Sequence, residues 1–235
     1  MSRVKPRDPN LPLLESVARA FGPLRERFVF IGGCVSGLLV TDAAAPPTRT
    51  TRDVDVIVEV VTLADYHHLE KELLAAGFRH DRSPDAPVCR WTIGAALVDV
   101  MPTDDRVLGF GNRWYPDAIR TAESFTLPSS GTIRLITAPL FLATKLEAFR
   151  GRGGGDYYAS HDLEDVVALV DGRSELVREI AASTGSPRDF LTTQIAALLN
   201  EAAFLQALPG HLPGDEAGQG RVPIVMDRMR QIAAL

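Results

Sequence analysis

The stretch TTRDVDVIVEV places two aspartates, Asp53 and Asp55, at the start of a run of valine and isoleucine. Successive side chains of a β-strand point to opposite faces, so both carboxylates project from one face while Val54, Val56 and Val58 point to the other. Two carboxylates this close repel each other unless a cation or a shared proton lies between them. Their hard oxygen atoms suit Mg²⁺, so the stretch predicts a strand that is buried on one face and carries a metal site on the other.

A third acid weighs against a simpler interpretation, in which the two aspartates only end a strand in solvent. Asp99 stands in ALVDVMP between Val98 and Val100, where an unpaired charge within a strand would be costly. If this strand runs beside that of Asp53 and Asp55, three carboxylates can hold two metal ions about 4 Å apart, as in phosphoryl or nucleotidyl transfer. We therefore expect Mg²⁺ as the cofactor, at two positions, with Mn²⁺ as the alternative.

The hydrophobic periodicity divides the chain into two parts. Up to residue 137 it predicts helices and strands, including two hairpins that turn at Gly94–Ala95 and at residues 129–131. From Pro139 onward it predicts mostly helices. We expect an α/β (α+β) fold, in which a mixed β-sheet with flanking helices forms a domain of residues 1–137 and a C-terminal helical domain covers residues 138–235.

Composition limits the class of protein. With 235 residues, of which 46% are hydrophobic, the chain can bury a sizeable core. No segment approaches the roughly 20 apolar residues of a membrane span, and MSRVKPRDPN has no apolar run after its basic residues, so we expect a cytoplasmic protein without membrane contact. The net charge of −5 means that nucleic-acid binding would need a local basic patch. Cys34 and Cys89 are too few and too far apart for a disulfide framework.

A glycine pair offers a second candidate site. RFVFIGG predicts a strand that ends in Gly32 and Gly33, and CVSGLLV predicts a short helix that follows. Such a turn lets backbone N–H groups approach a phosphate at the helix N-terminus. A P-loop is excluded, because Leu38 replaces the lysine required after Gly37, and a dinucleotide-binding fingerprint has Cys34 at its middle glycine. A turn whose glycines only allow positive φ or close packing is the alternative.

These stretches together resemble a known superfamily. IGG with a helix behind it, RTTRDVDVIV and LVDVM are similar to the DNA polymerase β-type nucleotidyltransferases, which combine a glycine turn, D-x-D on a strand and a third carboxylate on a neighbouring strand. The R-x-T-x-D-x-D spacing from Arg49 to Asp55 resembles the AbiEii-like nucleotidyltransferases, many of which are toxins of type IV toxin–antitoxin pairs. The resemblance covers residues 28–169 and implies a nucleotidyltransferase-type sheet. Ser36 is a displaced counterpart of the serine in the commoner Gly-Ser turn.

The same resemblance implies a lysine on one helix and an acid on a later one, matched in FLATKLEAFRGRGGGDYYASHDLEDVVAL. It implies that Lys145 neutralises a triphosphate and that Asp162 pairs with or positions it, with Asp165 as the alternative acid. From the residues alone, the favoured interpretation of Lys145 is a lysine whose stem covers apolar surface. Asp162 is equally a first-turn acid that suits the helix dipole after the N-cap Ser160.

The sequence therefore predicts a Mg²⁺-dependent nucleotidyltransferase that moves a nucleoside monophosphate from an NTP, such as ATP, to an acceptor hydroxyl. The resemblance favours a toxin-like enzyme that acts on RNA such as tRNA and has a cognate antitoxin, whereas the acidic net charge favours a small-molecule or protein acceptor. The alternatives are a non-catalytic nucleotide- or partner-binding module of the same fold and, more weakly, an NAD-dependent oxidoreductase. The residues predicted to act in catalysis are Asp53, Asp55, Asp99, Lys145 and Asp162, the first three as metal ligands. The residues predicted to contact the nucleotide are Gly32, Gly33, Ser36 and Lys145.

Overall fold

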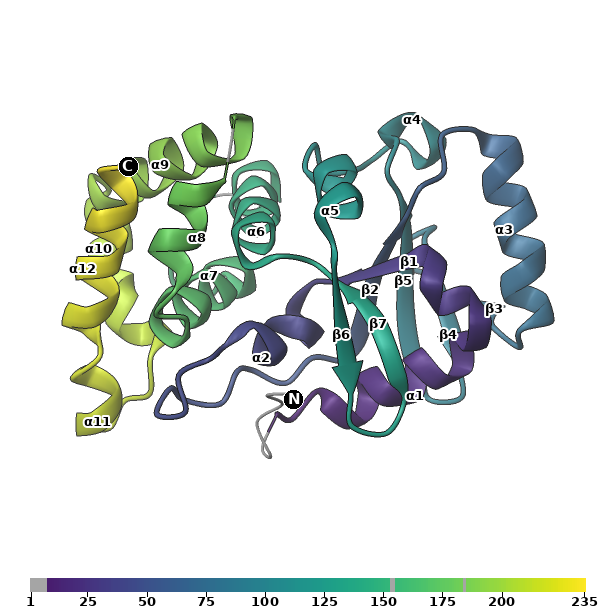
Figure 1. Cartoon of the computed structure of the whole chain (residues 1–235), viewed down its shortest axis with the longest axis horizontal. Coiled ribbons are helices and arrows are strands. Elements are labelled where there is room, and N and C mark those ends of the chain that lie inside the picture. The colour runs from purple at the N-terminus through teal and green to yellow at the C-terminus, as the bar shows by residue number, and fades with distance from the viewer. Residues whose placement is uncertain (1–7, 153–154, 184) are drawn as a thin grey trace. The chain divides into compact units, whose positions relative to one another are not determined.

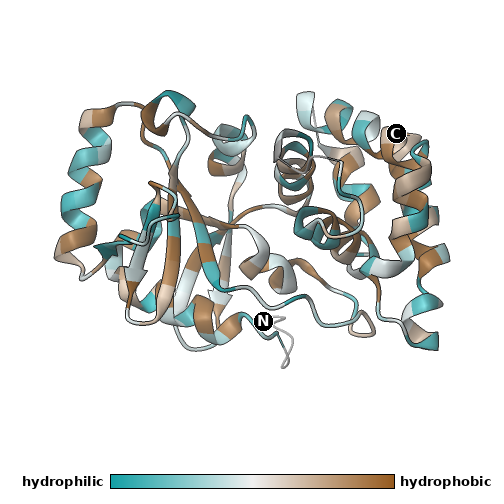
Figure 2. Cartoon of the chain, turned by 180° about the vertical axis from the view of Figure 1, so that it is seen from behind, coloured by the Kyte–Doolittle hydropathy of each residue, from teal (hydrophilic) through white to brown (hydrophobic). Residues whose placement is uncertain are grey.

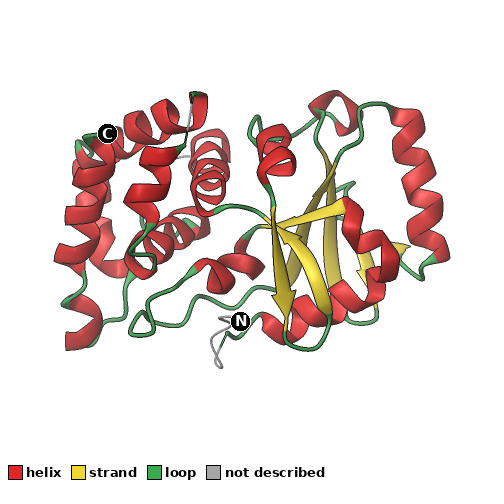
Figure 3. Ribbon diagram, in the orientation of Figure 1, coloured by secondary structure: helices red, strands yellow, loops and turns green. Residues whose placement is uncertain are grey.

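The computed structural model describes residues 8–152, 155–183 and 185–235. The chain forms two compact units. The first, which we call the sheet unit, comprises Met1–Gly37 and Arg49–Thr137, and the second, the helical unit, comprises Leu38–Thr48 and Ala138–Leu235. Figure 3 shows the strands gathered in the sheet unit and helices throughout the helical unit. Residues 1–7, which include most of the stretch behind the expectation of no leader sequence, lie outside the described residues.

The sheet unit is built on one mixed β-sheet, as the sequence predicts. Among the described residues it has seven strands in the order β3-β4-β5-β2-β1-β7-β6 (Figure 1). Strand β2 runs parallel to β5 and antiparallel to β1, and β1 runs parallel to β7. The strands are β1 (Phe28–Ile31), β2 (Asp53–Val58), β3 (Arg79–His80), β4 (Arg90–Ile93), β5 (Ala96–Pro102), β6 (Glu123–Leu127) and β7 (Gly131–Leu135).

The two hairpins form where the sequence predicts them. Strands β4 and β5 turn at Gly94 and Ala95, and Gly94 has a φ of 57°, which glycine tolerates without steric cost. The turn between β6 and β7 is fastened to the rest of the unit by side chains, because Glu15 accepts from the Ser129 backbone N–H at 2.7 Å and Arg25 donates to the Ser130 carbonyl at 3.0 Å.

The central strands lie in the interior of the sheet unit. All four residues of β1 are buried, as expected for a strand that is covered from two sides. Strand β5 is buried throughout one face, and on its other face Asp99 is buried between the half-buried Leu97 and Met101. Figure 2 shows the central strands coloured mainly as hydrophobic. Polar residues within these strands are therefore exceptional, and they occur at Asp53, Asp55 and Asp99.

Helix α1 (Leu11–Phe21) follows the periodicity of its sequence, with Leu14, Val17, Ala18 and Phe21 buried on one face. It contacts β2 and β5. The other helices of the sheet unit are the 3₁₀ segments η1 (Gly22–Arg27) and η2 (Gly33–Val35), and the α-helices α3 (Leu63–Ala75), α4 (Asp105–Leu108) and α5 (Tyr115–Thr121). The short helix α2 (Ser36–Leu39) begins in the sheet unit and ends in the helical unit.

The helical unit contains the predicted helix that starts at Pro139 and those that follow it. No helix among the described residues is long and apolar enough to cross a membrane. Its helical segments are α6 (Ala138–Arg152), α7 (His161–Gly172), α8 (Leu176–Ala182), α9 (Ser186–Leu199), α10 (Ala202–Ala207), η3 (Leu208–His211), α11 (Glu216–Gln219) and α12 (Val222–Ala233).

The segment of residues 38–48, which interrupts the sheet unit in sequence, is held within the helical unit by backbone and charged contacts. The backbone N–H groups of Thr41 and Asp42 both donate to the Gly172 carbonyl at 2.9 Å. Arg221 donates to the Asp42 carboxylate at 2.6 Å and to the buried Asp171 carboxylate at 2.7 Å. The domain boundary at residue 137 stays a prediction, because a domain in the strict sense must also fold alone.

Candidate active site

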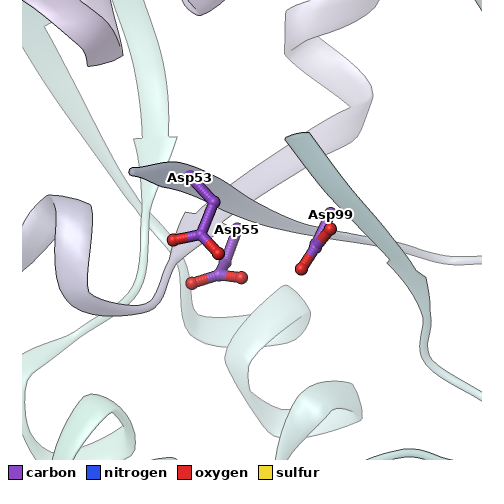
Figure 4. A group of neighbouring side chains, drawn as sticks. All are labelled: Asp53, Asp55 and Asp99. Carbon is purple, nitrogen blue, oxygen red and sulfur yellow. The ribbon is translucent and has the colours of Figure 1, made fainter. Parts of the chain in front are cut away.

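The three predicted metal ligands come together in the sheet unit. Asp55 on β2 lies directly opposite Asp99 on the parallel strand β5, and Asp53 is two residues earlier on the same face of β2. The expectation that the Asp99 strand runs beside the other two acids is confirmed. Each residue offers a carboxylate oxygen that lies within 4.8 Å of the others, and Figure 4 shows the three carboxylates on the same side of the two strands.

The glycine turn lies directly against this acid cluster. Strand β1 ends at Ile31, which pairs with Asp55, and Gly32 follows with a φ of 73°. A Cβ atom on Gly32 would lie 1.8 Å from Asp55 Oδ2, so only glycine leaves room for the carboxylate. A Cβ atom on Gly33 would lie 2.5 Å from Arg49 Nη2. The turn therefore meets an acid on one side and a guanidinium on the other.

Ser36 and Cys34 are both buried behind the turn. The Ser36 hydroxyl donates to the Gly33 carbonyl at 2.7 Å and its residue is 1% exposed, so it stabilises the turn. Its role as a phosphate contact stays a prediction. Burial, followed by the negative charge of Asp55, raises the pKa of the Cys34 thiol well above its ordinary value, so this thiol stays protonated at neutral pH.

Arg90 is a member of the cluster that sequence reasoning missed. From β4, its Nε donates to Asp99 Oδ1 at 2.8 Å, and its Nη2 donates to Asp99 Oδ2 at 2.7 Å and to Asp53 Oδ2 at 3.0 Å. The hydrogen bonds to Asp99 raise the pKa of Arg90, against the opposing effect of burial, and the charges of Asp99 and Asp53 raise it further. The guanidinium is thus a permanent positive charge between two of the three acids.

A signal for this contact is present in the sequence. The predicted hairpin turn at Gly94 and Ala95 pairs Ile93 with Ala96, and counting outward from that pair places Arg90 opposite Asp99. An arginine directly across an antiparallel pair from an aspartate forms a favourable cross-strand pair. The register of the hairpin therefore predicts the contact, once the turn is fixed to two residues.

Lys145 and the later acids form a separate cluster within the helical unit. From α6, Lys145 Nζ lies 2.7 Å from Asp165 Oδ2 and 3.2 Å from Asp162 Oδ1, and both acids are on α7. Ser160 caps α7, as predicted, by accepting from the Leu163 backbone N–H at 3.3 Å. All three charged side chains are nearly buried, with exposed fractions of 10%, 11% and 1% for Lys145, Asp162 and Asp165. Their roles in catalysis stay predictions.

The donor set of the acid cluster in the sheet unit fits a hard divalent cation. Three carboxylates offer oxygen atoms at close range, and Mg²⁺ and Mn²⁺ prefer oxygen ligands of this kind. The cluster combines three acidic side chains with one guanidinium, an excess of acids that suits a divalent cation. Asp99 is buried, whereas Asp53 and Asp55 are half-buried and can be reached from solvent.

Comparisons with known proteins support the fold. No protein-family model matches the sequence, and no curated protein matches it. Among solved structures, the chain is similar to an antigenic nucleotidyltransferase-like protein from Paracoccidioides brasiliensis, with a TM-score of 0.51 and 18% sequence identity. The similarity covers 86% of this chain and 92% of the other. The fold is therefore nucleotidyltransferase-like.

Proposed function

We propose that the protein is a Mg²⁺-dependent nucleotidyltransferase. The acceptor hydroxyl forms a bond to the α-phosphorus of an NTP, the bond from that phosphorus to the β-phosphate oxygen breaks, and pyrophosphate leaves. One observation supports this proposal above the others: Asp53, Asp55 and Asp99 converge from two parallel strands, next to a glycine turn, in a nucleotidyltransferase-like fold.

Each residue of the sheet-unit cluster has a role in the proposal. Asp53, Asp55 and Asp99 would hold two Mg²⁺ ions, which would supply Lewis acidity at the phosphates and lower the pKa of the attacking hydroxyl. Asp99, the most buried acid, helps to orient that hydroxyl. The backbone of Gly32 and Gly33 can approach the phosphates closely, because no side chain stands in the way.

Two features of the chain outside the acid cluster belong to the same proposal. Arg49, whose guanidinium lies against Gly33, adds positive charge where the phosphates would lie. Lys145, positioned by Asp162, neutralises the triphosphate, and the support for that role is the resemblance described above together with the 3.2 Å pairing of the two side chains.

For the acceptor we propose RNA such as tRNA, in a toxin-like enzyme of the AbiEii-like kind that is inhibited by a cognate antitoxin. The support is the R-x-T-x-D-x-D spacing that ends at Asp55. A small-molecule or protein acceptor is the second candidate, because the net charge of −5 gives no general attraction to RNA.

The experiment that tests the proposal is incubation of the protein with labelled NTPs, Mg²⁺, total RNA and cell lysate. Label on RNA that disappears in Asp53→Asn supports the first candidate, whereas label only on protein or small molecules supports the second. Asp85→Asn is the matched control, because Asp85 is an exposed acid of the sheet unit outside the cluster. NTP binding without pyrophosphate release, under every acceptor offered, would refute the activity and support a binding module.

A further inference from the structure

Arg90 already contacts carboxylate oxygens of two of the three predicted metal ligands. Its Nη2 lies 3.0 Å from Asp53 Oδ2 and 2.7 Å from Asp99 Oδ2, so one nitrogen bridges two of the three predicted metal ligands. Its Nε takes the second oxygen of Asp99 at 2.8 Å. Both oxygens of Asp99 are therefore engaged by a cation that belongs to the chain itself.

This contact is built into the sheet. Arg90 is the first residue of β4 and lies directly opposite Asp99 in the antiparallel pair with β5. Its backbone N–H donates to the Pro87 carbonyl at 2.9 Å, which fixes the start of the strand. The planar fork of arginine matches a carboxylate in two parallel bonds, and the side chain is only 21% exposed. The guanidinium is thus held in place by its own backbone and by Asp99.

The contact to Asp53 is different in kind. Asp53 is on the other strand, β2, its side chain is 34% exposed, and it receives a single bond of 3.0 Å. Of the three bonds that Arg90 makes within the cluster, this one is the longest and the most accessible to solvent.

We propose that Arg90 is an internal competitor of the divalent cation, and that it sets the metal affinity of the site. A cation bound by both Asp53 and Asp99 competes with Arg90 for their carboxylate charge, most directly at Asp53 Oδ2, while the two bonds from Arg90 to Asp99 keep that acid in register. This inference deepens the proposed function and rests on it only in assuming that the acid cluster binds a divalent cation.

Arg90 could instead help metal binding by organising the acids, and that role predicts the opposite change in metal affinity when Arg90 is removed. If Arg90 only organises the acids for metal binding, its removal disorders the cluster and weakens the affinity for the metal. If Arg90 competes, its removal frees two carboxylates and takes away a positive charge that repels the incoming cation. The sign of the change in metal affinity therefore separates the two roles, and it requires no measurement of activity.

The experiment is a titration of the full-length protein with Mn²⁺ alone, followed by the electron paramagnetic resonance signal of the free ion. We expect Arg90→Gln to bind Mn²⁺ about tenfold more tightly than the wild type or more, because a like charge within a few ångströms has been removed. Arg90→Lys, which keeps the charge but not the fork, should fall between the two. Arg79→Gln is the matched control, because Arg79 is an exposed arginine of the adjacent strand β3 that donates to the Leu74 and Phe78 carbonyls.

The outcomes separate this inference from the proposed function. Equal or weaker Mn²⁺ binding in Arg90→Gln overturns the inference, while label transfer can still succeed. Tighter binding that is lost in the double variant with Asp53→Asn supports it, even if no acceptor is ever labelled. No binding by any variant overturns both the inference and the metal-dependent activity. Should Arg90→Gln fail to fold, Arg90→Lys must still bind Mn²⁺ more tightly than the wild type.

Discussion

Each unit contains a positively charged side chain between aspartates, and the two clusters differ in solvent exposure and in the balance of acidic and basic groups. In the sheet unit, two of the three acids, Asp53 and Asp99, share the guanidinium of Arg90, and Asp53 keeps 34% of its side chain exposed. In the helical unit, Lys145 meets two acids and the most exposed of the three side chains reaches only 11%. Excess negative charge at an accessible place suits a ligand cation, whereas removing one partner from a nearly buried ion pair is costly to stability.

Removal of Lys145, the cation of the helical-unit cluster, should have the largest effect on stability. A small effect would contradict the contrast between the two clusters. Lys145→Ala leaves Asp162 and Asp165 as buried charges without their lysine partner, which costs about 3–5 kcal/mol in comparable buried pairs. Urea denaturation followed by circular dichroism measures the loss. Lys71→Ala, at an exposed lysine of α3, is the control and should change stability by less than about 0.5 kcal/mol. A loss below about 1 kcal/mol would show that the pair is not structural.

Gly32→Ala tests the sheet-unit site through its backbone. A Cβ at this position would lie 1.8 Å from Asp55 Oδ2, so the carboxylate must move away from the cluster. We expect nucleotidyl transfer to fall about 10²-fold, in line with the 10–100-fold cost of disturbing groups that position metal ligands. Gly94→Ala is the matched control, because Gly94 also has positive φ but its Cβ would meet nothing within 4 Å. It should cost about 1–2 kcal/mol of stability and leave the rate unchanged; equal losses of rate in the two variants would contradict the contact.

Mg²⁺ should stabilise the sheet unit and not the helical unit, because only the acid cluster of the sheet unit is expected to bind it. At ten times its Kd, a ligand that binds only the folded state adds about 1.4 kcal/mol. Both tryptophans, Trp91 and Trp114, are in the sheet unit, so their fluorescence reports on the unfolding of that unit. We expect Mg²⁺ to raise the midpoint of this transition in the wild type and not in Asp53→Asn. An equal rise in Asp53→Asn would place the ion elsewhere.

The smallest effect at neutral pH should come from the thiols beside the acid cluster. Burial and the negative charge of Asp99 raise the pKa of Cys89 from 9.0 to about 12, and Cys34 is raised in the same direction. Because the folded state keeps these protons while the unfolded state loses them, stability is fully present below pH 9 and falls as pH rises toward 12. Native protein at pH 8 should react only slowly with a thiol reagent, and Cys89→Ala should flatten the alkaline loss of stability. Rapid labelling of both thiols would contradict their burial.

Local sequence patterns were sufficient to predict both hairpins, the acid cluster and every described strand except the two-residue β3. The alternation of polar and apolar residues predicts strand β2. Its pairing with β5 follows because Asp99 needs a partner inside an apolar strand. The fold class was predictable for the same reason, since two hairpins and a helix-rich second half leave few architectures.

The remaining features depend on contacts between residues far apart in sequence. Arg221 reaches Asp42 across 179 positions, and no local periodicity records such a pair. Arg90 was missed for a different reason, because its signal lies in the register of a hairpin. The three acids indicated a metal as their partner, whereas the antiparallel neighbour strand supplies an arginine. The sequence offered Asp162 or Asp165 as the partner of Lys145, and in the structure Lys145 pairs with both.

The segment of residues 38–48 has a consequence for how this chain can be divided. Because it belongs to the helical unit but is inserted between Gly37 and Arg49 of the sheet unit, the backbone passes from one unit to the other three times. A single cut after residue 137 would remove the helices against which this segment is held and leave it dangling from the remaining half. To obtain either unit intact, the chain would have to be reconnected so that residues 38–48 stay covalently joined to the helical unit. Synthesis on the ribosome imposes the same order: the inserted segment emerges long before Gly172 and Arg221 exist to receive it.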